Sequence, residues 1–130
     1  MHTPQPTPHP LSAAVAACWR RLEADPRWDQ TDELLFQVAG LMLYGYAFGS
    51  GRLLHLLDVA DIDAVVVQQL VRAGAGPAYA QGLAEAARAT FEHPEDSPTA
   101  QLVEAGHACF AAGPDELAAA IYAAAASLRS

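Results

Sequence analysis

A stretch without any charged residue, Leu34 to Gly49 (LLFQVAGLMLYGYAFG), limits what this chain can fold into more than any other feature. It is shorter than the roughly 20 apolar residues that a membrane-spanning helix needs, and it contains Gln37, Gly40 and Gly45. A helix that is apolar on nearly every side is stable in water only when other elements surround it. We therefore predict a central core helix over residues 34–48, not a membrane span.

The remainder of the chain repeats apolar residues at helical spacing between Pro and Gly breaks. Pro26 should close a first helix, Thr31 should cap the central one, and Asp61 should cap the next. Pro77 suits a first helical position, and residues 93–97 (HPEDS) read as a loop. Since no long run alternates with period two, the predicted fold is all-α. It comprises six to seven short helices in a single domain over residues 11–130, preceded by a flexible Pro-rich leader over residues 1–10.

The cysteines and the N-terminus predict a cytoplasmic protein. Cys18 and Cys109 are far apart among apolar neighbours, which favours two buried thiols over a disulfide framework. The leader has no basic cluster and no apolar run, so it resembles neither a signal peptide nor a transit peptide.

No constellation of residues predicts catalysis, a metal or a cofactor. The chain has no lysine, which excludes a phosphate-binding Gly-Lys loop. Ser50 lies between two glycines but follows a helix, whereas a nucleophilic elbow needs a preceding strand. His107 and Cys109 are two residues apart, a spacing that places them on nearly opposite sides of a helix. We predict a protein that is not an enzyme.

Acidic residues carry the main functional signal, since seven arginines against fifteen acids give a net charge of −8. Several acids stand at predicted helix starts, where the helix dipole already accounts for them. Two clusters remain as candidate partner-binding residues: Asp58, Asp61 and Asp63, and Glu92, Glu95 and Asp96. They form either a solvated surface that aids solubility or a face that docks a basic protein. The negative charge disfavours nucleic acids and anionic membranes as partners.

Three short motifs carry a resemblance to a known family. Gly49-Ser50-Gly51 follows the apolar helix, Gly74-Ala75 ends a later helix, and Asp115-Glu116-Leu117 opens the last, which contains Tyr122. This layout resembles a bacterial family of uncharacterised α-helical domains that includes a DNA-mimic protein. The resemblance implies a non-enzymatic binding protein, which in some members occupies a DNA-binding protein; related domains look like immunity proteins that neutralise toxins.

The turn after the apolar helix departs from the family pattern. Its Asn is missing here, and Arg52 stands where the family has an aromatic residue. The resemblance therefore implies a partner site only as a region, made of Gly49, Ser50, Gly51 and Arg52.

The leading hypothesis is an acidic interaction domain, of the immunity or DNA-mimic type, that binds a basic protein such as a toxin or a DNA-binding protein. Steep weakening of the complex by salt would support it. An alternative is a small-ligand-binding protein or enzyme with a pocket between helices, lined by Trp19, Tyr44, Tyr46 and His55. A third is a homodimer or larger homo-oligomer formed through faces that include Leu117, Ile121 and Leu128.

Overall fold

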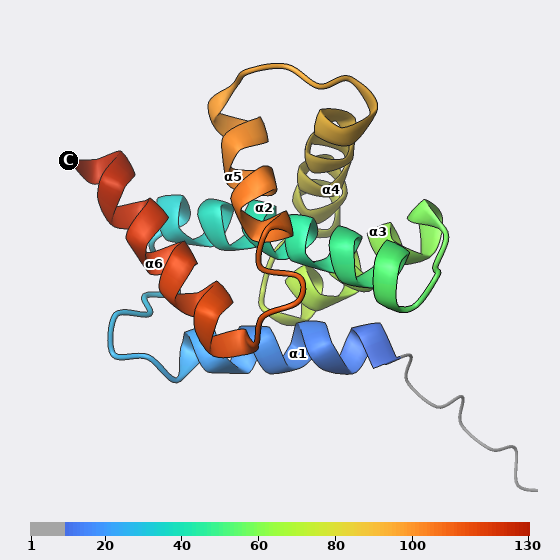
Figure 1. The fold of residues 1–130 in the computed structure, drawn as a ribbon. Coiled ribbons are helices and arrows are strands. Elements are labelled where there is room, and N and C mark those ends of the chain that lie inside the picture. The colour runs from blue at the N-terminus through green and yellow to red at the C-terminus, as the bar shows by residue number, and fades with distance from the viewer. Residues whose placement is uncertain (1–9) are drawn as a thin grey trace, which may run out of the picture.

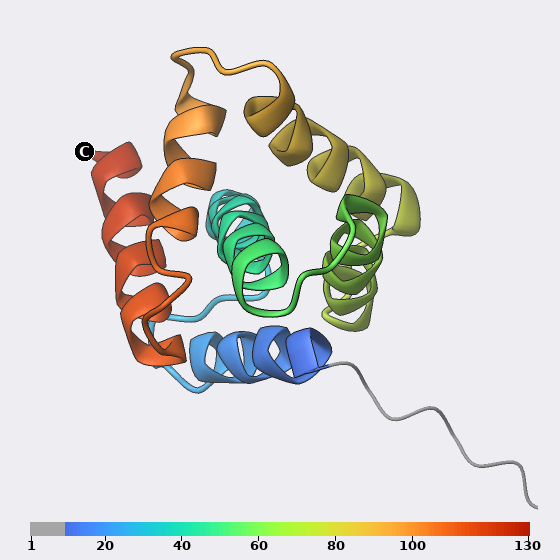
Figure 2. The same cartoon turned by 45° about the vertical axis from the view of Figure 1, so that its right-hand side comes forward.

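A computed structural model describes residues 10–130, which form six α-helices and one π-helical turn (Figures 1 and 2). In chain order these are α1 (Pro10–Glu23), α2 (Glu33–Gly49), η1 (Ser50–Leu54), α3 (Val59–Arg72), α4 (Pro77–Glu92), α5 (Pro98–His107) and α6 (Pro114–Arg129). No strand occurs among the described residues, so the all-α prediction is confirmed. The flexible leader predicted over residues 1–10 lies outside the described residues except for Pro10, which is the first residue of α1 and not part of a leader.

Helix α2 runs through the middle of the molecule with the other helices around it, as Figure 2 shows. Every residue from 38 to 47 is buried, which is why this helix can be apolar on all sides. By length and composition alone the continuous helical stretch Glu33–Leu54 could cross a membrane, but 83% of its apolar window is buried inside the fold. That burial is typical of the core helix of a compact domain.

The tightest contact in the fold is the crossing of α2 and α5, where two glycines bring the helix backbones together. A Cβ atom on Gly45 would lie 1.9 Å from the carbonyl oxygen of Val103. A Cβ atom on Gly106, across the crossing, would lie 2.0 Å from the carbonyl oxygen of Met42. Only hydrogen fits at either position, so this crossing requires glycine in both helices.

Helix starts differ from the predicted ones by a residue or two. Asp32, and not Thr31, caps α2: its carboxylate accepts a hydrogen bond from the Leu35 amide at 3.1 Å. The Thr31 hydroxyl instead donates to Asp29 at 2.7 Å. Helix α3 begins at Val59, so Asp61 lies in its first turn and is not its cap. In each case an acid still stands where the helix dipole favours it.

The face of α6 considered for self-association forms part of the core. Leu117 and Ile121 are 1% and 0% exposed, whereas Leu128, near the end of the helix, is 49% exposed. Tyr122 fixes the helix against α1, since its hydroxyl donates to the Leu22 carbonyl at 2.7 Å. A homo-oligomer would therefore have to use another surface.

Candidate functional site

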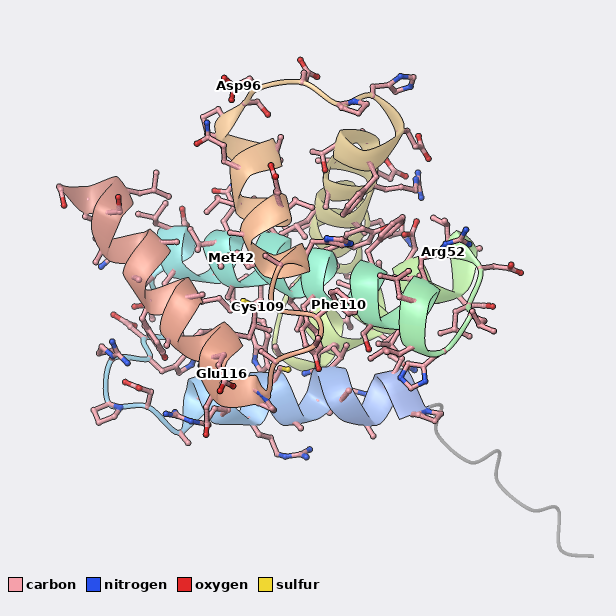
Figure 3. The ribbon with its side chains drawn as sticks, in the orientation of Figure 1. Met42, Arg52, Asp96, Cys109, Phe110 and Glu116 are labelled. Carbon is pink, nitrogen blue, oxygen red and sulfur yellow. The ribbon has the colours of Figure 1, made fainter. Side chains whose placement is uncertain are left out.

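An acidic part of the surface lies where α4 ends and α5 begins. Between Arg88 and Arg129 the sequence contains no arginine or lysine but six acids. Four of these lie on the last residue of α4, the loop after it and α5: Glu92, Glu95, Asp96 and Glu104, hereafter the acidic end. All four are exposed, and Asp96 marks the outermost loop in Figure 3.

Little positive charge compensates the acidic end. The Nε atom of Arg88 lies 3.3 Å from the Oε1 atom of Glu92, and the Gln101 side-chain amide donates a hydrogen bond to Asp96 at 3.0 Å. Glu95 and Glu104 have no ion pair among the described residues, and both line the same clefts between the loop and α5. Two unpaired carboxylates therefore face a common space.

Asp63, a predicted contact residue, is bound inside the fold. Its carboxylate accepts a hydrogen bond from the Tyr44 hydroxyl and pairs with the Arg88 guanidinium, and its side chain is only 17% exposed. Burial, and then this hydrogen bond, raise the pKa of Tyr44. Asp63 thus joins α2, α3 and α4, and we leave it out of the candidate surface.

The neighbouring acids Asp58 and Asp61 are exposed, at the N-terminal end of α3. Since Asp63 in the first half of α3 meets Arg88 in the last half of α4, these two helices run antiparallel there. Asp58 and Asp61 therefore lie toward the same end of the α3–α4 pair as Glu92.

The partner region implied by the family resemblance, Gly49 to Arg52, is mostly interior. The α-helix predicted over residues 34–48 ends at Gly49, but Gly49-Ser50-Gly51 does not interrupt the helical course of the chain, because α2 continues directly into the π-helical η1. All three residues are buried, and a Cβ atom on Gly49 or Gly51 would lie 2.7 Å from Phe110 or Ile62. They are packing residues, and only Arg52 is exposed; it donates to the Leu57 carbonyl at 3.2 Å (Figure 3).

Three leucines just after Arg52 are exposed, a feature that the sequence analysis missed. Leu53, Leu54 and Leu56 are 59%, 60% and 85% exposed. Leu56 also has a φ of 54°, in the left-handed region that leucine rarely adopts. The signal in the sequence was four leucines within RLLHLLD, directly after the glycines, where no single helical face can bury them all.

Leu56→Asn is expected to stabilise the protein by about 1 kcal/mol, because asparagine tolerates the left-handed conformation better than leucine. The side chain buries little, so its loss costs little. Leu56→Val is expected to destabilise by about 1 kcal/mol, since β-branching makes a positive φ still less favourable. Urea unfolding of both variants tests the backbone conformation, and an equal effect of the two would contradict it.

The ligand pocket expected between helices is not formed by the residues proposed for it. Trp19, Tyr44 and Tyr46 are at most 6% exposed and pack in the core. A different cleft, of about 490 Å³, opens between the start of α2 and the α3–α4 turn. Gln30, Glu33, Gln37, Phe36 and Tyr79 are among its lining residues.

The described part of the chain offers no candidate metal site. No group of three or more His, Cys, Asp or Glu residues there could hold a metal ion. Both cysteines are free; burial raises the pKa of the Cys18 thiol to about 11, which keeps it protonated at neutral pH.

Comparisons with known proteins give no match. No family model matches the chain, and neither the curated proteins nor the solved structures contain one that is significantly similar to it.

Proposed function

We propose that this chain is a non-enzymatic interaction domain that binds a basic protein through its acidic end, in the manner of an immunity protein or a DNA mimic. The observation that carries the proposal is the pair of exposed, unpaired carboxylates of Glu95 and Glu104, beside Glu92 and Asp96. Among the residues that the structure describes, Arg88 is the only arginine that reaches this group, and it is shared with Asp63.

The electrostatic advantage of such a surface is chiefly one of recognition. A single exposed ion pair contributes only about 0–1 kcal/mol. Several like charges on one side nevertheless steer an oppositely charged partner toward it and repel competitors of the same sign. A basic protein gains from this field, whereas a nucleic acid or an anionic membrane is repelled by it.

A charge-neutralised bait tests the proposal. Glu95→Gln with Glu104→Gln removes two charges from the acidic end, and Glu23→Gln with Glu33→Gln removes two exposed charges from α1 and α2. We expect a basic protein captured from the native host to bind the first double variant about tenfold more weakly than wild type, and the second about as tightly as wild type. Circular dichroism confirms that both variants are folded.

The salt dependence of the captured complex provides the second readout. Raising the ionic strength from about 50 mM to about 500 mM shortens the screening length and should weaken the wild-type complex steeply. The proposal is wrong if the affinity does not change with salt concentration, or if both double variants bind the captured protein equally well.

A second candidate function rests on the 490 Å³ cleft, which is within the size range of small-molecule sites. Its amide and aromatic side chains suit a small polar ligand with an apolar face. A ligand that binds only the folded state raises the melting temperature. A saturable rise with one compound of a metabolite panel, abolished by Tyr79→Ala, would favour this function over the first.

A further inference from the structure

A second property of the acidic end is a cleft of about 310 Å³ between the end of α4 and α5. Its lining combines two chemistries. Phe91, Val103 and His107 supply an aromatic and apolar wall, while Glu95 and Glu104 supply the unpaired carboxylates. This volume is at the lower limit of small-molecule sites, so it suits one side chain better than a cofactor.

The aromatic wall is held in place by its neighbours. The Phe91 ring stacks on Phe48 with centroids 3.9 Å apart and planes at 8°. The centroid of the His107 ring lies 5.5 Å from that of Phe91 and 5.8 Å from that of Phe110. Gly49 keeps this packing possible, since a Cβ atom there would lie 3.1 Å from the His107 ring. The wall therefore presents a preformed surface to the cleft.

Carboxylates beside an aromatic wall form the environment that a guanidinium prefers. The planar guanidinium stacks on rings and donates in a fork to carboxylates, whereas a lysine ammonium is a compact and strongly hydrated charge. The chain uses this combination elsewhere: Arg27 lies 4.2 Å over the ring of Tyr122 and donates to both oxygens of Asp25 at 2.9 Å.

In one other acidic cleft, the one between α3 and α4, the arginine comes from the chain itself. Arg88 lines the cleft between α3 and α4 together with Asp63 and Glu85. No arginine of the described residues lines the cleft between α4 and α5. The aromatic wall and the two carboxylates there thus lack the cation that completes the same arrangement at Arg27.

We infer that the cleft between α4 and α5 receives an arginine side chain of the basic partner, with its guanidinium against Phe91 and His107 and its N–H groups donating to Glu95 and Glu104. This inference rests on the proposed function and specifies the side chain by which the partner is recognised. It predicts a preference for arginine over lysine, which a diffuse negative surface would not show.

Three short peptides test the preference: acetyl-Gly-Arg-Gly-amide and its lysine and norleucine analogues. In an NMR titration at low salt, we expect the arginine peptide to cause saturable changes in chemical shift that are confined to residues 90–107. The lysine peptide should bind about fivefold more weakly, and the norleucine peptide should cause no shifts. Equal binding of the arginine and lysine peptides, or unsaturated shifts over the whole acidic surface, would overturn the inference.

A variant that fills the cleft separates its shape from its charge. Ala100 lines the cleft, and Ala100→Leu fills it without changing any charge; Ala105→Leu makes the same change at an exposed position of α5 outside it. We expect Ala100→Leu to weaken the arginine peptide about tenfold and Ala105→Leu to leave it unchanged. Circular dichroism and the melting temperature verify that both variants fold.

The captured basic protein distinguishes failure of this inference from failure of the proposed function. If Ala100→Leu and Ala105→Leu bind that protein equally while the Glu95→Gln/Glu104→Gln variant does not, the acidic end is the binding surface but the arginine cleft is wrong. If Ala100→Leu alone loses affinity and keeps the salt dependence of wild type, the cleft is confirmed. If both glutamate double variants bind as wild type does, the proposed function is wrong and the inference falls with it.

Discussion

Gly45→Ala and Gly106→Ala are each expected to destabilise the protein by more than about 3 kcal/mol, enough to abolish a large part of the stability of a domain of this size. The added methyl group would lie 1.9 Å or 2.0 Å from a carbonyl oxygen of the opposite helix. Side chains can move away from such an overlap, but here both obstacles are backbone atoms of α2 and α5. The helices would have to separate, and the core around Met42 would open.

Gly82→Ala is the matched control. Gly82 lies in the middle of α4, and nothing lies within 4 Å of where its Cβ would be. Alanine there lowers the entropy of the unfolded chain without a clash, so we expect a gain of about 0.5–1 kcal/mol. Urea unfolding measures all three variants. Similar stabilities of Gly45→Ala and Gly82→Ala would show that α2 and α5 do not cross in contact.

Leu41→Asp is expected to unfold the protein at room temperature. Leu41 is 3% exposed on the buried central helix, and an unpaired carboxylate taken out of water there costs several kcal/mol in addition to the lost apolar burial. The whole stability of such a domain is about 5–15 kcal/mol. Far-ultraviolet circular dichroism and a thermal melt would show the loss of cooperative folding.

Leu53→Asp places the same change on the exposed turn after this helix. Leu53 is 59% exposed, so we expect the free energy of unfolding of this variant to stay within about 0.5 kcal/mol of the wild-type value. A cooperative melt of Leu41→Asp near the wild-type temperature would contradict the central position of α2. A large loss with Leu53→Asp would contradict the exposure of η1.

The all-α class and the central helix were predictable because they depend on local patterns. The uncharged segment from Leu34 to Gly49 has to be surrounded, and Pro77 and the polar HPEDS loop mark boundaries that belong to the chain itself. The predicted positions of the helix caps were less accurate. Thr31 and Asp32 both favour the start of α2, and Asp58 and Asp61 both favour the start of α3, so only the three-dimensional structure selects between them.

What the sequence could not reveal depends on contacts between distant segments. The need for glycine at positions 45 and 106 follows from the crossing of α2 and α5, which no local pattern encodes. Asp63 resembled a helix-start acid, yet the partners that remove it from the surface, Tyr44 and Arg88, are 19 and 25 residues away. Gly49 to Gly51 resembled a helix break for the same reason, because the neighbours that bury the two glycines come from α1, α3, α5 and the segment after α5.

The candidate surface was predictable in part. Glu92, Glu95 and Asp96 are exposed as their polar loop predicts. Glu104 was not singled out, because it lies on α5 and is distant from Glu95 along the sequence. Only the fold brings the two residues to the same cleft. The spacing of charges shows where acids gather along the chain, whereas their convergence on one cleft is a property of the fold.

The most direct test of the acidic end as a binding surface is an amide hydrogen-exchange footprint of the chain, alone and with the captured basic protein. We expect the bound partner to slow exchange in residues 91–107 and at the start of α3, and to leave the outer faces of α1 and α6 unchanged. Protection confined to α1 and α6, with unchanged exchange between residues 91 and 107, would contradict the acidic end as the binding surface.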